Sequence, residues 1–433
     1  MMGKKIIIQF FASGLTGLLA FLSLSLSARF FGPEILGQVA YLSGLLGLVF
    51  AFSDLGLSRA HVHFTAANQG KPAAGFLMMK LALLGLCGLA AVLVGKINQQ
   101  LSWLFLILLV FEVLFRLADS LLITFEGREK VWPQNLTRLA GKLIKLVAVV
   151  IFALAWRNSL GYSLTYLIEA VVVLVLAIIF GRGLWRFKPE PATIKSYWRY
   201  SLPFTLIMPL SYLQDNGLIL IIRRFWSAEV LGVYAASLGL FGLLKSFSSS
   251  LMVFFFPRIS RLNETKDLEQ IQRYTDTAVK FSVYILVPLA IILFVGSGWL
   301  VPLILGRQFF EAISIFRVWL IGILILGIFT PYDHVLFATR NHRSIVKINL
   351  LTTLIVLWLG WRLIPTWGGL GAAMAAVSGW LVGGLWQFAI LRQKTGIKFL
   401  RDWRLTKVEV KYLYGLFNSF GQALFRANRK KIS

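Results

Sequence analysis

The sequence RFWSAEVLGVYAASLGLFGLLKSFSSSLMVFFF, residues 224–256, decides how this chain is organised. Its first part, residues 224–236, repeats the pattern RFFGPEILGQVAY of residues 29–41, which lies 195 positions earlier; six of the thirteen residues are identical and no gap is needed. The remainder is an apolar run long enough to cross a bilayer, with Lys245 near its middle. The pattern predicts two related halves and a cation inside a membrane span of the second half.

The composition is that of a membrane protein. Hydrophobic residues make up 58% of the chain, charged residues make up 14%, and the mean hydropathy is +0.76. A soluble domain of this composition would have too few polar residues to cover its surface. Apolar runs of about 20 residues recur along the chain, which indicates an all-α protein that crosses the membrane many times.

The apolar runs predict about twelve transmembrane helices, six in each half. Because six is even, both halves have the same orientation, as parallel repeats related by an axis along the membrane normal. We expect an N-terminal lobe over 1–196, a C-terminal lobe over 197–392 and a basic tail over 393–433. The predicted spans are 6–28, 39–57, 75–95, 101–124, 138–156, 162–181, 200–222, 231–256, 279–298, 313–336, 344–364 and 368–391.

The loops distribute their positive charge unevenly between the two sides of the membrane. The side that carries both termini holds 30 lysines and arginines, against 7 on the other side. Positive loops stay in the cytoplasm, so both termini are predicted to be cytoplasmic. This placement, rather than nucleic-acid binding, explains the net charge of +26. The loop 257–278 is expected to hold a surface helix. The tail either forms an amphipathic helix on the anionic inner leaflet or only fixes the topology; its helical stripe consists of Leu413, Leu416, Phe417, Phe420 and Leu424.

Cations inside the spans are the first candidates for a binding site. A cation at the centre of a membrane helix costs about 2.5–3.5 kcal/mol, so such residues usually face a cavity or a partner. Arg116 shares a helix face with Glu112 and Asp119, and a self-neutralising cluster is the alternative there. Lys142 could snorkel to the cytoplasmic surface instead. The candidate substrate-binding cations are Lys245, Lys145, Arg116, Lys142, Lys80 and Arg317.

Polar residues inside the spans are candidates for coupling to an ion gradient. Asp215 lies beside Gln214 and Asn216 in a segment interrupted by Pro203 and Pro209. Transporters place binding and coupling groups in such interrupted helices. Two further acids, Asp54 and Asp333, lie near cytoplasmic helix ends, where capping or pairing is the expected role. Coupling to protons or sodium is therefore possible, and we expect no other cofactor.

The sequence carries no pattern typical of an enzyme. It contains no phosphate-binding glycine loop and no catalytic serine–histidine–aspartate set, and the pair His61 and His63 is too small for a metal site. The loops are too short to hold a catalytic domain. The two bundles, with cations between them, favour a transporter of an anionic substrate, and a diphosphate suits scattered point charges.

The repeat and three further segments resemble the polysaccharide (Wzx-type, O-antigen and exopolysaccharide) flippases, a branch of the superfamily that includes multidrug and toxin extruders. These segments are LLGLVFAFSDLGLSRA (45–60), LGVYAA (231–236) and YDHVLFATRNHR (332–343). The resemblance implies a V-shaped bundle of twelve helices and a cationic central cavity. It implies alternating access that moves a polyprenyl-diphosphate-linked oligosaccharide from the inner to the outer leaflet of a bacterial or archaeal cytoplasmic membrane.

Three other functions remain open at this point. A multidrug or toxin exporter shares the architecture but would use buried acids for cationic substrates. A lipid II flippase related to this family would often carry extra spans beyond twelve, which the weak apolar face of the tail does not supply. A polysaccharide polymerase or ligase would need a large outer loop with catalytic residues. The expected partners are the lipid-linked oligosaccharide, anionic inner-leaflet lipids and possible polysaccharide polymerase or assembly proteins, with no nucleic acid.

Overall fold

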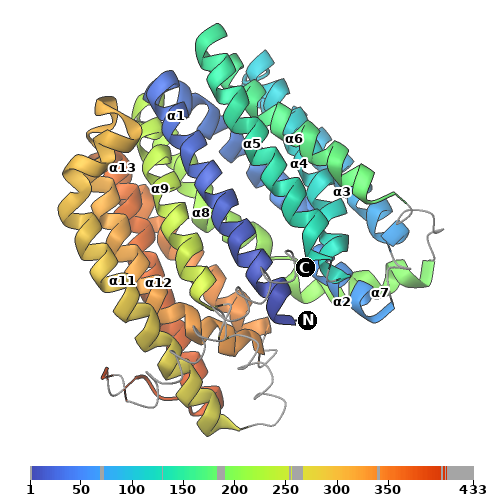
Figure 1. Ribbon diagram of the computed structural model, residues 1–433, viewed down its shortest axis with the longest axis vertical. Helices are drawn as coiled ribbons and strands as arrows, with labels where there is room; N and C mark the ends of the chain where they lie inside the picture. The colour runs from blue at the N-terminus through green and yellow to red at the C-terminus, as the bar shows by residue number, and fades with distance from the viewer. Residues whose placement is uncertain are drawn as a thin grey trace, which may run out of the picture.

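The computed structural model describes residues 2–68, 73–128, 130–182, 191–252, 255, 267–338, 342–400, 403, 404 and 406, and these residues form helices and no strand. The predicted stripe in the tail lies outside them. The helices that Figure 1 labels are α1 (Met2–Phe50), α2 (Leu57–Asn68), α3 (Ala73–Ile97), α4 (Trp103–Gly127), α5 (Val131–Ala155), α6 (Ser159–Phe180), α7 (Pro191–Ser201), α8 (Ile207–Phe225), α9 (Ala228–Met252), α11 (Leu268–Leu305), α12 (Ala312–Ala338) and α13 (His342–Thr395).

These helices account for the twelve predicted spans. Both α1 and α13 contain two spans, because each is interrupted at a glycine with positive φ, Gly32 (φ 78°) and Gly368 (φ 54°). The other spans are α3, α4, α5, α6, α8, α9, α11 and α12. The prediction of an all-α membrane protein is confirmed.

Charge distinguishes three of the membrane helices from the rest. In the described part of the chain, seven helices are long and apolar enough to cross a membrane by length and composition. The helices α4, α5 and α8 are also long enough, but each carries three charged side chains within its apolar run. Those charges include four of the candidate site residues, Arg116, Lys142, Lys145 and Asp215.

The helices form two lobes, shown side by side in Figure 1. We call α1–α6 the N-lobe and α8–α13 the C-lobe. Within them α4 packs on α6, α5 on α6, α11 on α12 and α12 on α13, while α1 lies at the boundary and packs on both α5 and α9. The lobes approach each other at the end opposite the N-terminus, which we call the far end, and diverge towards the end that carries it.

The repeated segments meet each other at the far end. A Cβ atom added to Gly37 would lie 1.7 Å from the carbonyl oxygen of Ala228, and one added to Gly232 would lie 1.7 Å from that of Pro33. Residues 37 and 232 are equivalent in the repeat, and so are 33 and 228. The contact is therefore reciprocal, and it explains why both copies of the repeat carry glycine at this position.

Helix α7 connects the lobes and is fixed to the N-lobe by two contacts. Gly56 has a φ of 81°, and a Cβ there would meet the carbonyl oxygen of Ser201 at 2.9 Å. The buried ring of His61 lies 2.8 Å from the hydroxyl of Tyr197 and 2.8 Å from that of Thr124. These contacts give His61 a packing role and place the start of α8.

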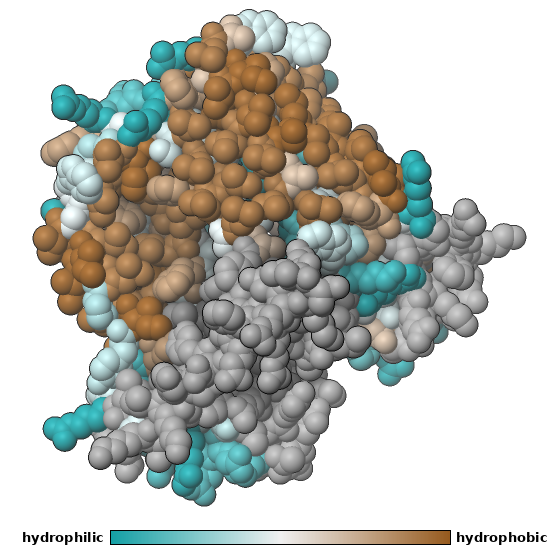
Figure 2. Space-filling view, in the orientation of Figure 1, coloured by the Kyte–Doolittle hydropathy of each residue, from teal (hydrophilic) through white to brown (hydrophobic). Residues whose placement is uncertain are grey.

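The outer surface of both lobes is apolar. Large hydrophobic side chains such as Leu154, Val295 and Trp103 are more than three-quarters exposed. Figure 2 shows a broad apolar surface over the upper part of the molecule, with hydrophilic residues at its ends. Such a surface suits contact with lipid chains rather than water.

Two segments differ from the sequence expectation. The loop 257–278 was expected to hold a separate surface helix. From Leu268 onward this stretch is instead the first part of α11, which continues to Leu305. The seventh span begins at Ile207, not near 200, because a short 3-10 turn containing Pro203 separates it from α7. Pro203 has no backbone N–H to donate to a helical hydrogen bond, so the α-helix is interrupted there.

Candidate functional site

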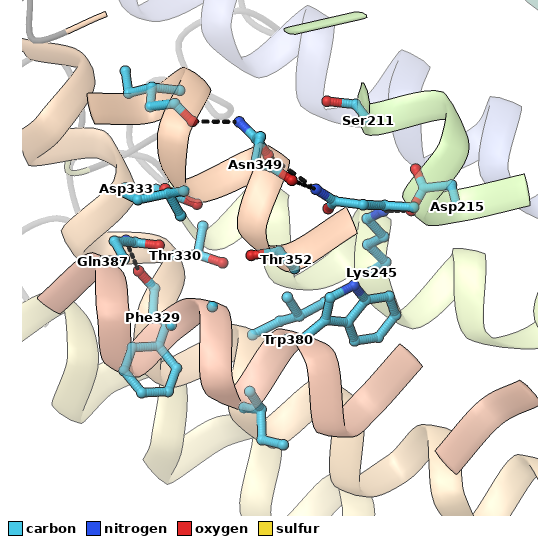
Figure 3. Close-up of a pocket in the computed structure, with 17 residues that line it drawn as sticks. Ser211, Asp215, Lys245, Phe329, Thr330, Asp333, Asn349, Thr352, Trp380 and Gln387 are labelled. Carbon is cyan, nitrogen blue, oxygen red and sulfur yellow. Dashed lines mark hydrogen bonds and ion pairs between the residues drawn. The ribbon is translucent and has the colours of Figure 1, made fainter. Parts of the chain in front are cut away.

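A polar pocket lies inside the C-lobe between α8, α9, α12 and α13. Figure 3 shows Ser211 and Asp215 reaching it from α8, Lys245 from α9, and Asp333 from α12. The pocket has a volume of about 190 Å³, enough for several water molecules or a small charged group. Polar residues far apart in the sequence thus converge inside an otherwise apolar lobe.

The ion pair between Lys245 and Asp215 marks the open side of this pocket. The Lys245 Nζ lies 2.9 Å from Asp215 Oδ1, and the two side chains remain 42% and 47% exposed. The indole of Trp380 lies on the other side of the ammonium group, 6.0 Å from ring centroid to Nζ. An ion pair this open has weak mutual stabilisation, so either partner can exchange the other for a ligand.

Amide and hydroxyl groups line the wall formed by α8 and α13. The Gln214 Nε2 donates to the carbonyl oxygen of Asn349 at 2.9 Å and to Thr353 Oγ1 at 3.0 Å. Thr353 in turn donates to the Asn349 carbonyl at 2.7 Å. This network fixes α8 against α13 and holds Asp215, the next residue after Gln214, at the mouth of the pocket.

Asp333 also lines the pocket but has no ion-pair or hydrogen-bond partner among the described residues. Its neighbours on the pocket wall include Thr330 and Gln387, and the Gln387 Nε2 donates to the carbonyl oxygen of Phe329 instead. A carboxyl group without a protein partner in an apolar lobe favours a bound water, proton or cation, because burying a bare charge is costly.

The N-lobe contributes a second pair across the boundary. The Arg116 Nε lies 3.1 Å from Glu112 Oε2 on α4. Tyr212 of α8 lies three residues before Asp215, and its hydroxyl group donates to a carbonyl oxygen of α1 at 3.2 Å. Helix α1 also packs on α4. Helix α1 is therefore in contact with both helices, α4 and α8, that carry the acids of the two pairs.

Two further cations share one acid inside the N-lobe. Glu169 lies 2.6 Å from Lys142 and 3.1 Å from Lys145, and its side chain is only 4% exposed. The Lys145 Nζ also lies 3.2 Å from the ring centroid of Tyr166. This cluster carries one excess positive charge. Lys142 is its more accessible member, whereas Lys145 is buried.

The remaining candidates lie elsewhere. Lys80 pairs with Asp54 in a largely buried contact, and Ser58 also donates to Asp54, so this acid holds the turn that starts α2. Arg317 donates to Ser297 at 2.8 Å and lies over a ring of α11, away from the pocket. Asn216 lies on α8 beside Asp215 but does not line the pocket.

Several contributors to the site were absent from the sequence-based set. Asn349, Thr352 and Gln387 are polar residues within the long apolar run of α13, and that isolation is a signal that could have found them. The pairing of Glu169 with Lys142 and Lys145 could not be predicted from spacing, since the acid and the lysines lie on different helices. Among the described residues, no group of three or more histidine, cysteine or acidic side chains is placed to hold a metal ion.

The chain is similar to proteins of polysaccharide biosynthesis in sequence and to a lipid flippase in fold. A family described as "Polysaccharide biosynthesis protein" matches residues 26–314. The capsular polysaccharide biosynthesis protein CapF of Staphylococcus aureus is 20% identical over 391 residues, which cover 86% of this chain and 95% of CapF. Among solved structures, an inward closed conformation of the lipid II flippase MurJ has a TM-score of 0.66 at 14% identity, covering 99% of this chain and 100% of MurJ.

A second solved structure supports the same fold. The inward-facing conformation of a multidrug resistance MATE family transporter has a TM-score of 0.65 at 14% identity, and the alignment covers 91% of this chain and 94% of that one. These similarities confirm the two bundles of six helices predicted from the repeat and the MATE-like fold that the family resemblance implied.

Proposed function

Since this chain belongs to the family of polysaccharide biosynthesis proteins, we propose that it moves a polyprenyl-diphosphate-linked oligosaccharide across the membrane by alternating access. It is a multi-pass membrane protein of the flippase and transporter superfamily. We also propose that the lipid moves from the cytoplasmic to the outer leaflet of a cytoplasmic membrane. Both termini of the protein would then lie on the cytoplasmic side.

The observation that carries the proposal is the half-exposed pair of Lys245 and Asp215 at the open side of the C-lobe pocket. A diphosphate carries more negative charge than one carboxylate, so it competes with Asp215 for the ammonium group. Arg116 of the N-lobe is also partly exposed and is paired with Glu112. A head group between the lobes would draw on Lys245 from the C-lobe and Arg116 from the N-lobe.

Coupling to an ion gradient follows from the acids of the same pocket. A proton or a sodium ion on Asp215 would release Lys245 for the diphosphate, and Asp333 offers a second site for the ion. Because an ion shifts a conformational equilibrium only by its different affinity for the two states, one of these acids must change its surroundings during the cycle.

The alternative is a multidrug or toxin exporter with a cationic substrate. The observation that favours it is the carboxyl group of Asp333, which has no partner among the described residues and could accept a cation. In that case Lys245, which lines the same pocket as Asp333, would repel the cationic substrate. The two functions therefore predict opposite effects of removing Lys245.

The test uses full-length protein in proteoliposomes that contain a fluorescent polyprenyl-diphosphate oligosaccharide. Movement is followed by the access of a membrane-impermeant quencher, with and without a proton or sodium gradient. Wild type should move the lipid, and Lys245→Ala should slow this movement by about tenfold or more, the value of one charged hydrogen bond. Arg138→Ala is the matched control, because Arg138 forms an equally exposed pair with Asp119.

Two outcomes would contradict the proposal. If the wild-type protein exports cationic dyes but does not move the lipid under any ion gradient, it is a multidrug or toxin exporter. Equal slowing by Lys245→Ala and Arg138→Ala would mean that the cavity pair has no special part in transport.

A further inference from the structure

Three arginines line one groove at the far end of the molecule. Arg29 comes from the end of the first segment of α1, Arg157 from the turn between α5 and α6, and Arg307 from the turn after α11. The groove has a volume of about 680 Å³ and crosses the boundary between the lobes. It lies apart from the pocket of the candidate site, and no residue lines both.

Two of the arginines are held in place by main-chain carbonyl groups. Arg29 donates through Nε to the carbonyl oxygen of Ile304 at 3.2 Å and through a terminal nitrogen to that of Leu303. Arg157 donates through Nε to the carbonyl oxygen of Phe30. A guanidinium group has five N–H donors, so both keep donors for a ligand. Their planes are fixed before any ligand arrives.

Arg307 completes the groove from the C-lobe. It is exposed, and its side chain has no hydrogen-bond or ion-pair partner among the described residues. The neighbouring Gln308 donates to the carbonyl oxygen of Ala28 at 2.8 Å and so holds the C-lobe wall against α1. None of the described residues that line the groove is a carboxylate, so the three positive charges share one space without an acid on its wall.

The floor of the groove is apolar. Leu26 and Phe30 of α1 and Pro302 of α11 line it beside the arginines. Figure 2 shows hydrophilic residues over the upper ends of α1 and α11, directly above the broad apolar surface. A free anion would use only the charged part of this groove, whereas a lipid would use both parts, its head group at the arginines and its chain along the apolar wall.

We propose that this groove binds the phosphate head group of an anionic lipid and that the bound lipid holds the far ends of the lobes together. With the orientation predicted from the loop charges, this lipid belongs to the outer leaflet. The groove takes Arg29 and Arg157 from one lobe and Arg307 from the other, so it exists only while the far end is closed. A ligand that binds one conformation alone shifts the equilibrium towards it.

The experiment places full-length protein in nanodiscs of phosphatidylcholine with or without phosphatidylglycerol. Retention of phosphatidylglycerol is measured by native mass spectrometry. The distance between the far ends is measured by pulsed electron paramagnetic resonance in a Cys87→Ala background, with spin labels at Asn98→Cys and Ser314→Cys, which are exposed positions in the two lobes. Neither readout depends on transport of a glycolipid, so the result is separate from the proposed function.

The test variant is Arg307→Gln, because Arg307 makes none of the hydrogen bonds between the lobes. Its matched control is Arg224→Gln, which removes an exposed arginine at the same end of the molecule and outside the groove. We expect Arg307→Gln to lower phosphatidylglycerol retention about fivefold, the usual effect of one surface arginine on anionic lipid binding. Phosphatidylglycerol should narrow the distance distribution in wild type and in Arg224→Gln, but not in Arg307→Gln.

Three results would overturn the proposal. Equal retention by Arg307→Gln and Arg224→Gln would show that the groove is not the site. Displacement of phosphatidylglycerol by inorganic phosphate at comparable concentration would show that a free anion is the ligand. Binding in the groove without a change in the distance distribution would refute its effect on closure.

Discussion

In the N-lobe, Glu169 holds Lys142 and Lys145 in a cluster that is almost closed to solvent, whereas in the C-lobe Asp215 holds Lys245 in a pair that leaves nearly half of each side chain exposed. Both groups of charges lie within apolar helices. The nearly buried Glu169 is shared by two lysines and has its charge satisfied internally, while the open pair can exchange partners. The difference assigns a structural role to the first group and a binding role to the second.

The repeated segments show a similar contrast. Gly37 and Gly232 make the same contact with each other's segment, as their equivalence requires. The arginines that begin the two segments do not behave alike: Arg29 donates to carbonyl oxygens of the other lobe, whereas Arg224 is exposed and lines no part of the groove. Identical residues in a repeat thus give identical packing only where both partners belong to the repeat.

The largest effect is expected from Glu169→Gln, which leaves two lysines without their shared acid. Removal of one partner from a buried ion pair costs about 3–5 kcal/mol, because the remaining charge is buried alone. The free energy of unfolding should fall by that amount in a denaturation series in detergent. Glu126→Gln, an exposed acid on α4, is the control. A loss no greater than that of the control would show that the cluster is open.

The next effect concerns the reciprocal contact. Gly37→Ala and Gly232→Ala each place a methyl group against a carbonyl oxygen of the opposite segment, and overpacking of this kind costs about 1–3 kcal/mol. Thermal unfolding should show equal losses for the two variants. Gly242→Ala is the control on α9, where an added methyl group meets no atom within 4 Å. Unequal losses of stability in the two variants would show that the two glycine contacts are not equivalent.

A smaller effect separates the two arginines. Arg29→Gln removes hydrogen bonds between the lobes that are partly open to solvent, so we expect it to lower stability by about 1 kcal/mol. Arg224→Gln should leave stability unchanged. Unfolding midpoints measured side by side test this difference, and equal midpoints would mean that the bonds of Arg29 contribute nothing.

The smallest effect is expected from Asp215→Asn, the C-lobe counterpart of Glu169→Gln. An exposed ion pair contributes about 0.5 kcal/mol, so the free energy of unfolding should hardly change. A large loss of stability in the denaturation series would assign Lys245 a structural role and remove the contrast between the lobes.

The sequence was sufficient for the fold because apolar length and the repeat are local signals. The twelve spans, their division into halves and the equivalence of Gly37 and Gly232 follow from residues close to one another or from a fixed offset of 195. The contact between these two glycines was not predicted. The partners of the charges were harder to predict. Lys245 and Asp215 were both singled out, but their pairing joins α8 to α9, and helix spacing within one segment carries no information about a neighbouring helix.

The far-end groove was beyond sequence reasoning for the same reason. Arg29, Arg157 and Arg307 were counted only as loop charges, because 128 and 150 positions separate them in the chain. Their convergence depends on how the ends of α1 and α11 meet. Arg317 shows the opposite case: it lies within a span, yet it packs against α11 outside the pocket because Ser297 accepts its hydrogen bond.

The reciprocal glycine contact has one more consequence. A contact in which residue 37 meets 228 while residue 232 meets 33 maps onto itself under a two-fold rotation. Homodimers use such isologous interfaces, in which one surface patch serves both subunits. The boundary between the lobes therefore has the geometry of a dimer of two six-helix chains. Because α7 joins the lobes in one chain, their ratio is always one to one, and they do not need to meet by diffusion in the membrane.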